Sequence, residues 1–134
     1  KLEQGWIPQV LDDVGDILPR DAEFIIEIIE ARDVPKVDLF IDPYIEGYFS
    51  ILENDVHKRV SDIFKTPAKM DNDSPVWNFY ANLQCSPPSD AYLTLCICNS
   101  ERPDPVSTAH RLILSAQLVN NSRLLGTVRI PVRE

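Results

Sequence analysis

The chain has 134 residues, which is enough for one domain with a single core, and 13 Lys and Arg against 21 Asp and Glu give a formal net charge of -8. This acidic balance argues against nucleic acid as a partner, because such surfaces gain affinity by neutralising phosphates with basic side chains. No stretch reaches the roughly 18 to 20 apolar residues that span a bilayer, and the first residues do not resemble a secretion signal. We therefore expect a cytoplasmic module.

The first 22 residues are expected to pack on the domain that follows, and two interpretations of them remain open. Residues 6–10 read as an edge strand. Alternatively, apolar residues at helical spacing between Val10 and Leu18 predict a short helix that Pro19 would end.

The main domain is predicted to span residues 23–134 and to begin with a strand. Residues 23–31 are rich in β-branched side chains and apolar on both alternating sets, as in a central strand covered on two faces. An acidic loop bracketed by Pro35 and Pro43 follows, and then a second strand at residues 44–52, in which Gly47 indicates a bulge.

Four further strands are predicted downstream, separated by clusters of turn residues. A polar connection precedes the third strand of the chain, and a turn cluster at residues 70–75 follows it. The predicted strands are residues 60–66, 77–84, 92–98 and 125–132. Short strands without sustained helical periodicity predict an all-β, eight-stranded antiparallel Greek-key sandwich.

The long connection between Cys98 and Leu124 fits two patterns, because its apolar residues alternate like a strand and also fall at helical spacing. A full strand would place the next strand at the wrong end of the sandwich, whereas a helix can return to the same end. We therefore predict a helical insert before the last clear strand, capped near Ser107 and reaching about Val119.

The acidic loop is the first candidate functional feature. Asp38 and Asp42 lie four residues apart and flank three consecutive apolar residues, Leu39, Phe40 and Ile41. Carboxylates at this spacing can converge on one hard cation, while exposed apolar side chains indicate an apolar partner such as a membrane. The alternative is that these three side chains fold back into the end of the sandwich.

These segments together resemble the C2 domain, the sandwich found in protein kinase C, synaptotagmins, ferlins and cytosolic phospholipases. The resemblance covers most of the chain from about Phe24 to Val132. It is carried by IIEARDVPKVD, DPYIEGYF, KTPAKMDNDSPVWN, YLTLCICNSE and LLGTVRIPV, in the family's order. The family brings the loops after these segments to one edge of its fold.

The resemblance implies Ca²⁺ as the bound ion and assigns its ligands to three loops. Asp38 and Asp42 match the first loop, and the second loop offers Asn72 or Asp73. The third loop matches at Asn99, Glu101 and Asp104. The chain departs from the family pattern in having Asn99 and Glu101 in place of aspartates, Ile41 in place of a small polar residue and Phe79 in place of a glutamate.

Two other groups of residues have simpler interpretations. Four basic residues are candidates for a phosphoinositide-binding face or, alternatively, for plain solubilising charges: Lys58, Arg59, Lys65 and Lys69. The cysteines, an odd number, favour reduced, buried thiols: Cys85, Cys96 and Cys98.

No nucleophile elbow, phosphate-binding glycine loop or metal-binding His pair occurs, so the sequence does not predict an enzyme. It predicts a peripheral module that binds anionic phospholipid membranes in the presence of calcium and targets a larger parent protein to them. The alternative is a calcium-independent module that binds a protein partner and retains a vestigial calcium site.

Overall fold

The computed structural model describes residues 12–35, 41–100 and 124–133, and within these ranges the chain forms strands and no helix. It follows that no helix in the described part is long and apolar enough to cross a bilayer. The strands are β1 (Asp13–Val14), β2 (Glu23–Glu30), β3 (Pro43–Glu53), β4 (Val56–Arg59), β5 (Phe64–Lys65), β6 (Val76–Gln84), β7 (Tyr92–Asn99) and β8 (Leu124–Pro131).

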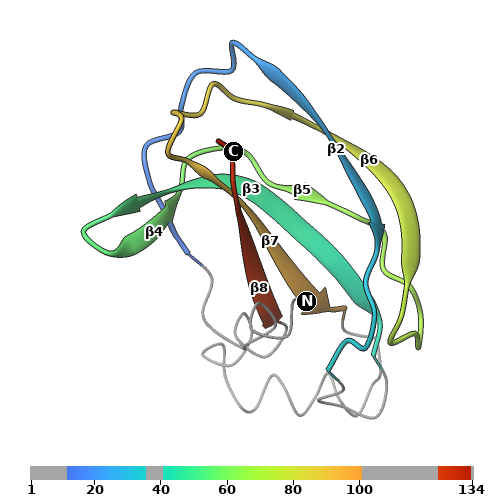
Figure 1. Ribbon diagram of the computed structural model, residues 1–134. Coiled ribbons are helices and arrows are strands. Elements are labelled where there is room, and N and C mark those ends of the chain that lie inside the picture. Colours follow the sequence, from blue (N-terminus) through green and yellow to red (C-terminus); the bar gives the residue numbers. More distant parts are fainter. Residues whose placement is uncertain (1–11, 36–40, 101–123, 134) are drawn as a thin grey trace, which may run out of the picture.

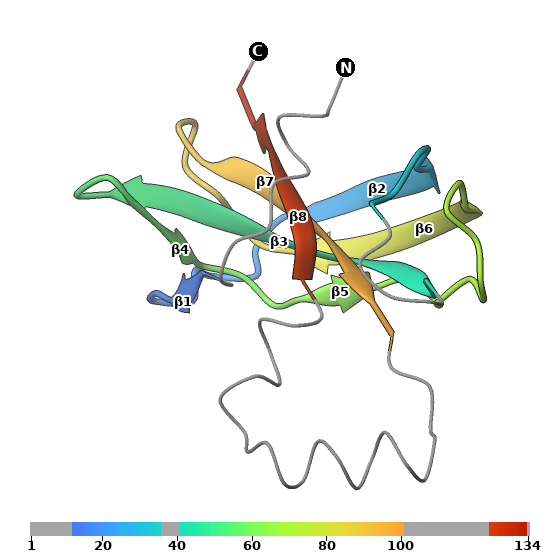
Figure 2. The same cartoon turned by 90° about the horizontal axis from the view of Figure 1, so that it is seen from below.

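The strands form two sheets that face each other (Figure 1). The large sheet has the order β1-β4-β3-β7-β8, and β5 pairs with β3 at one side. The small sheet consists of β2 and β6. Every pairing is antiparallel except the short parallel pair of β1 and β4. The predicted all-β antiparallel sandwich is therefore confirmed, and Figure 2 shows the two layers from below.

Alternating apolar side chains explain why the sheets face each other. On β2 the even-numbered residues turn inward, and Phe24 packs edge-on against Phe49 of β3 with ring centroids 4.9 Å apart. On β6 the inward residues include Trp77, whose indole nitrogen donates to the Pro67 carbonyl at 2.7 Å. The fully buried residues of this core include Phe49, Ile41, Leu83, Ile97, Leu125 and Val60.

The connection between β3 and β4 is a tight turn that the sequence analysis treated as a polar linker. Asn54 and Asp55 have φ values of 53° and 62°, and Glu53 pairs with Val56 across them. Two consecutive residues with positive φ are the signature of a type I′ hairpin turn. The turn places β4 directly after β3.

This turn corrects the predicted strand at residues 60–66. The structure instead has β4 before that segment and the two-residue β5 within it. Ser61 ends the run of strand residues, because its hydroxyl accepts from the Phe49 N–H at 2.8 Å and donates to the Asp62 carbonyl. The chain thereby bends from β4 towards β5.

Gly47 does not mark a bulge, because β3 runs in regular register with β7 past this position. The Phe64 ring of β5 lies where a Cβ atom on Gly47 would stand. Glycine is needed here for close packing of β5 on β3.

Two expectations fall partly or wholly outside the described residues. Residues 1–11 are not described, and the adjoining segment contributes the short strand β1. The predicted helix of residues 107–119 lies within the undescribed residues 101–123, so it stays a prediction.

Candidate functional site

Asp42 lies at the start of β3, at the end of the sandwich where three loops meet. Its residue surface is only 3% exposed. The backbone N–H of Asp71 donates to its carboxylate Oδ1 at 2.7 Å. A buried carboxylate is retained only where donors or cations balance its charge, so this position is a candidate functional centre.

Backbone hydrogen bonds hold the three loops around Asp42. The Asn72 N–H donates to the Ile41 carbonyl at 3.0 Å, which joins the loop before β6 to the loop before β3. The Ser100 N–H donates to the Asp42 carbonyl at 2.9 Å, which joins the segment after β7 to the same point. We call the end of the sandwich formed by residues 41–42, 71–73 and 99–100 the loop edge.

Asn99 fixes this arrangement through its side chain. Its Oδ1 accepts the Asp42 N–H at 2.8 Å, and Pro43 pairs with Asn99 in the β3–β7 ladder. The amide oxygen therefore organises the loop edge directly. An aspartate would place a full charge at the same point beside the buried Asp42 carboxylate.

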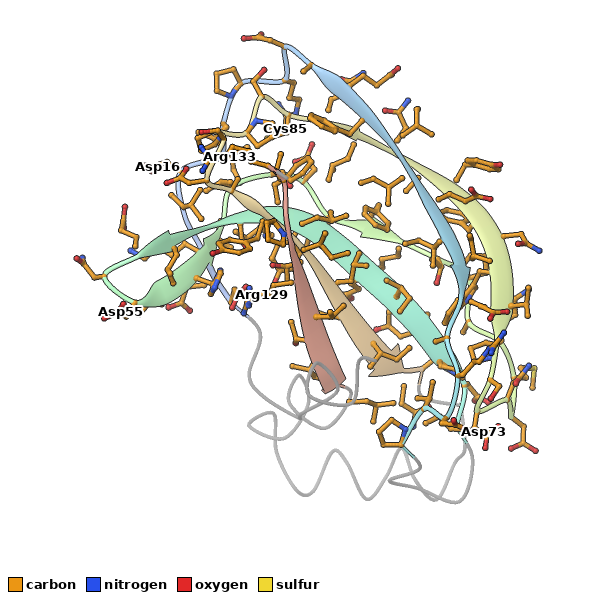
Figure 3. The ribbon with its side chains drawn as sticks, viewed as in Figure 1. Asp16, Asp55, Asp73, Cys85, Arg129 and Arg133 are labelled. Carbon is orange, nitrogen blue, oxygen red and sulfur yellow. The ribbon has the colours of Figure 1, made fainter. Side chains whose placement is uncertain are left out.

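The second loop presents its two candidate ligands differently. The Asn72 Oδ1 accepts the Ser74 N–H at 2.9 Å, which closes a local turn. The Asp73 side chain is exposed, while its backbone carbonyl accepts the Val34 N–H at 2.8 Å. Figure 3 shows Asp73 at the loop edge, with Asp55 of the β3–β4 hairpin far away at another corner of the molecule.

The other predicted site residues divide between the core and the undescribed segments. Ile41 is 1% exposed and belongs to the main core cluster, which corrects its assignment to a membrane-inserting tip. It is buried because its backbone is tied to the loop before β6, which turns the side chain inward. The remaining predicted residues lie outside the described ranges: Asp38, Leu39, Phe40, Glu101 and Asp104.

Oxygen donors at the loop edge suit a hard cation such as Ca²⁺, which prefers carboxylate and amide oxygens. Asp42, Asn72 and Asn99 are of this type. Among the described residues, however, no three acidic, His or Cys side chains come together in a group that could hold a metal ion. A complete calcium site would therefore need the acids predicted in the undescribed parts of the first and third loops.

The four basic residues do not gather on one face. Lys58 and Arg59 are consecutive on β4, so their side chains point to opposite sides of the sheet. Lys58 lies 2.9 Å from Glu53, and Lys65 lies 3.4 Å from the buried Glu46. Their charges are balanced by acids of β3, and the geometry gives no support to a common phosphoinositide site.

A buried polar network that the sequence did not reveal lies on the outer face of the large sheet. Arg129 of β8, labelled in Figure 3, forms a two-point ion pair with Asp12 at 2.8 and 2.9 Å. The Tyr48 hydroxyl donates to the same carboxylate at 2.9 Å. Burial raises the pKa of the Tyr48 hydroxyl and that of the Cys96 thiol beside it. These groups stay neutral at neutral pH, so Cys96 acts as packing and not as a nucleophile.

The comparison with known families gives a single result. The family model of the C2 domain matches residues 22–134. The chain belongs to the C2 domain family. No curated protein sequence matches it.

Solved structures similar to this C2 domain share its fold. A C2 domain of plant Extended Synaptotagmin 1, the one designated A, has 19% identity and a TM-score of 0.55, with coverage of 81% of this chain and 67% of that chain. The third C2 domain of the KIAA1228 protein has 20% identity and a TM-score of 0.56, with coverage of 89% and 72%. Human GIVD cytosolic phospholipase A2 has 21% identity and a TM-score of 0.52, and 82% of this chain matches 13% of that chain.

Proposed function

We propose that this C2 domain binds anionic phospholipid membranes through its loop edge, that the binding depends on calcium, and that it targets a larger parent protein to the membrane. The observation that carries the proposal is the position of Asp42, a buried carboxylate at which backbone bonds from three loops converge. Membership of the C2 family supports it, because calcium and phospholipid binding are typical of that family.

Charge explains why calcium would control binding. The chain carries a net charge of -8, so an anionic membrane repels it. Two unit charges 4 Å apart repel by about 4 kcal/mol at an effective dielectric of 20, so acids that converge at the loop edge need a counter-ion. Bound Ca²⁺ would supply that positive charge and a coordination position for a lipid phosphate.

The chain's own residues have defined roles in this proposal. Asp42 supplies a carboxylate held in place by the Asp71 N–H, and Asn99 fixes the Asp42 backbone. Asp38, Glu101 and Asp104 supply the further charges, as the family resemblance implies. Asn99 in place of an aspartate lowers the charge of the site, so we propose weak binding that the lipid assists.

Leu39 and Phe40 supply the apolar contribution. Burying each in the bilayer interface would stabilise the complex by about 1.5 to 3 kcal/mol, which alone gives only weak, reversible docking. Ion bridging and apolar insertion are therefore both required. Because the mechanism is binding alone, we propose that the domain is not an enzyme.

Co-sedimentation with vesicles tests the proposal. With vesicles of phosphatidylserine and phosphatidylcholine, we expect the chain to pellet in calcium and to stay in the supernatant in chelator. Asp42→Asn preserves the oxygen that accepts the Asp71 N–H but removes the charge, and it should abolish calcium-dependent pelleting. The matched control is Asp90→Asn, at an exposed position in the β6–β7 connection. Equal pelleting in calcium and chelator would refute the proposal.

A second candidate function is binding of a protein partner without calcium. One observation favours it: β2 borders the small sheet and no described strand covers its second edge.

A further inference from the structure

The sheets of the sandwich differ in size, and β2 is the strand at which they differ. Five strands follow one another across the large sheet, whereas the small sheet has only β2 and β6. In Figure 1, β6 forms the outer border of the small sheet near β5, and β2 lies on its side towards β7 and β8. Within the described part of the chain, β2 therefore pairs with β6 along one edge and with no strand along the other.

The hydrogen-bond pattern shows which backbone groups of β2 face this free edge. The Cys85 N–H donates to the Ala22 carbonyl at 2.9 Å, so these two residues form a hydrogen-bonded pair. In an antiparallel ladder every second pair is of this kind, so the even-numbered residues from 24 to 28 bond to β6. The odd-numbered residues direct both backbone groups to the free edge. They are Glu23, Ile25 and Glu27.

Apolar side chains lie incompletely covered on both sides of this edge. On the outer face Ile25 is 61% exposed and Tyr80 of β6 is 66% exposed. On the inner face Phe24 and Ile26 belong to the core but are only partly buried. Ile130 of β8 shares the inner face of the large sheet with that core and is 46% exposed. An added strand would cover the inner side chains and extend the small sheet over β7 and β8.

The charges beside the edge indicate the composition of such a strand. Glu23 and Glu27 alternate with isoleucines on the outer face of β2. Glu23 accepts only from the neutral Asn82 amide, and Glu27 forms no ion pair with any described residue. Basic side chains directly opposite would be stabilising, whereas a second copy of this acidic chain would be repelled.

We propose that the free edge of β2 binds an extended segment of a partner protein that carries apolar side chains on one face and Lys or Arg on the other. The segment adds to the small sheet as a third strand. Main-chain hydrogen bonds to Glu23, Ile25 and Glu27 supply the affinity. The acidic side chains and the apolar inner face supply the selectivity.

A short peptide probe tests this proposal with the full chain. The probe is a fluorescein-labelled peptide of alternating Lys and Val with the length of β2, and its counterpart alternates Glu and Val. We expect fluorescence anisotropy to show binding of the Lys peptide and much weaker binding of the Glu peptide. Hydrogen exchange should slow at the amides of Ile25 and Glu27, while the even-numbered amides of β2, already bonded to β6, change little. Absence of this odd-numbered protection would overturn the proposal.

Two variants separate strand addition from general attraction between opposite charges. Glu27→Lys should weaken binding of the Lys peptide by about fivefold or more, while Asp90→Lys, with the same change of charge at an exposed site away from β2, should leave it unchanged. Ile25→Pro removes the edge N–H but no bond to β6, so it should fold and lose peptide binding. Thermal melting checks that it folds. Equal weakening by the two lysine variants would overturn the proposal.

The other occupants have their own outcomes. A dimer in sedimentation velocity with odd-numbered β2 protection in the absence of peptide would assign the edge to a second copy and overturn the proposal. The proposed membrane function is tested separately, because Asp42→Asn should not change peptide binding.

Discussion

Asp12 and Arg129 form the most buried ion pair among the described residues, with side chains 10% and 20% exposed. Burial alone would lower the pKa of Arg129, but the hydrogen bonds and charge of Asp12 outweigh it and raise the pKa. Arg129 also donates to the Thr94 hydroxyl at 2.9 Å. The pair therefore attaches the N-terminal segment to the outer face of the large sheet.

Replacing Asp12 with Asn should lower the free energy of unfolding by about 2 kcal/mol, because it leaves the guanidinium of Arg129 without a counter-charge in a half-buried position. Urea denaturation measures the change. The matched control is Asp62→Asn, which breaks the exposed ion pair with Arg20 and should change stability little. Equal effects of the two substitutions would contradict this account.

Gly47 should be intolerant of a side chain. A Cβ atom there would overlap the Phe64 ring, so Gly47→Ala should lower the free energy of unfolding by about 1 to 3 kcal/mol. The double variant Gly47→Ala with Phe64→Leu should lose less stability than the sum of the two single changes, because the smaller side chain vacates the space. Additive losses in thermal melts would show that the contact does not limit the packing of β5.

His57 should make stability depend on pH. Burial, together with the charge of Arg129, lowers the pKa of its imidazole in the folded chain below its ordinary value. The unfolded chain then takes up the proton first, so this contribution is fully present above about pH 6.5 and is lost as the pH falls through the lowered folded value. Thermal melts at a series of pH values measure it. In His57→Gln this part of the pH dependence should disappear, and an unchanged profile would exclude His57 as its source.

At the scale of elements, the β3–β4 hairpin depends on its type I′ turn. Asp55 occupies the second central position with a φ of 62°, where glycine is preferred. Asp55→Gly should therefore raise the free energy of unfolding by about 0.5 to 1 kcal/mol, and Asp55→Val should lower it. Chemical denaturation of both variants gives the comparison, and a stabilising Val would contradict the assignment of the turn.

Alternation of apolar residues was enough to predict most of the strands. It located β2, β3, β6, β7 and β8 within a few residues, because each places a regular set of side chains in the core. It failed at residues 56–66, where strand and turn are set by the conformation of Asn54 and Asp55 and not by apolar periodicity. Turn chemistry was the missing information.

The candidate site could be predicted from the sequence only in part. The spacing of carboxylates identified Asp42, which lies at the junction of three loops. Sequence could not show that Ile41 enters the core or that the Asn99 oxygen accepts a backbone N–H. The part played by Asp71 was missed because its contribution is a backbone N–H, which no side-chain pattern reveals.

At the scale of the whole molecule, the two proposed binding regions use different parts of the sandwich. The loop edge gathers the ends of β3 and β7, whereas the free edge runs along β2 in the other sheet. The domain could therefore hold a membrane at one region and a partner strand at the other, and each can be tested without disturbing its counterpart.

Calcium titration followed by the backbone amide signals of the chain in solution tests the central claim most directly. Binding at the loop edge predicts that the largest shifts fall on Asp42, Asp71, Asn99 and Ser100, whose amides bond across that edge, and that Asp42→Asn removes them. Absence of calcium-dependent shifts, or shifts centred elsewhere on the sandwich, would contradict the account.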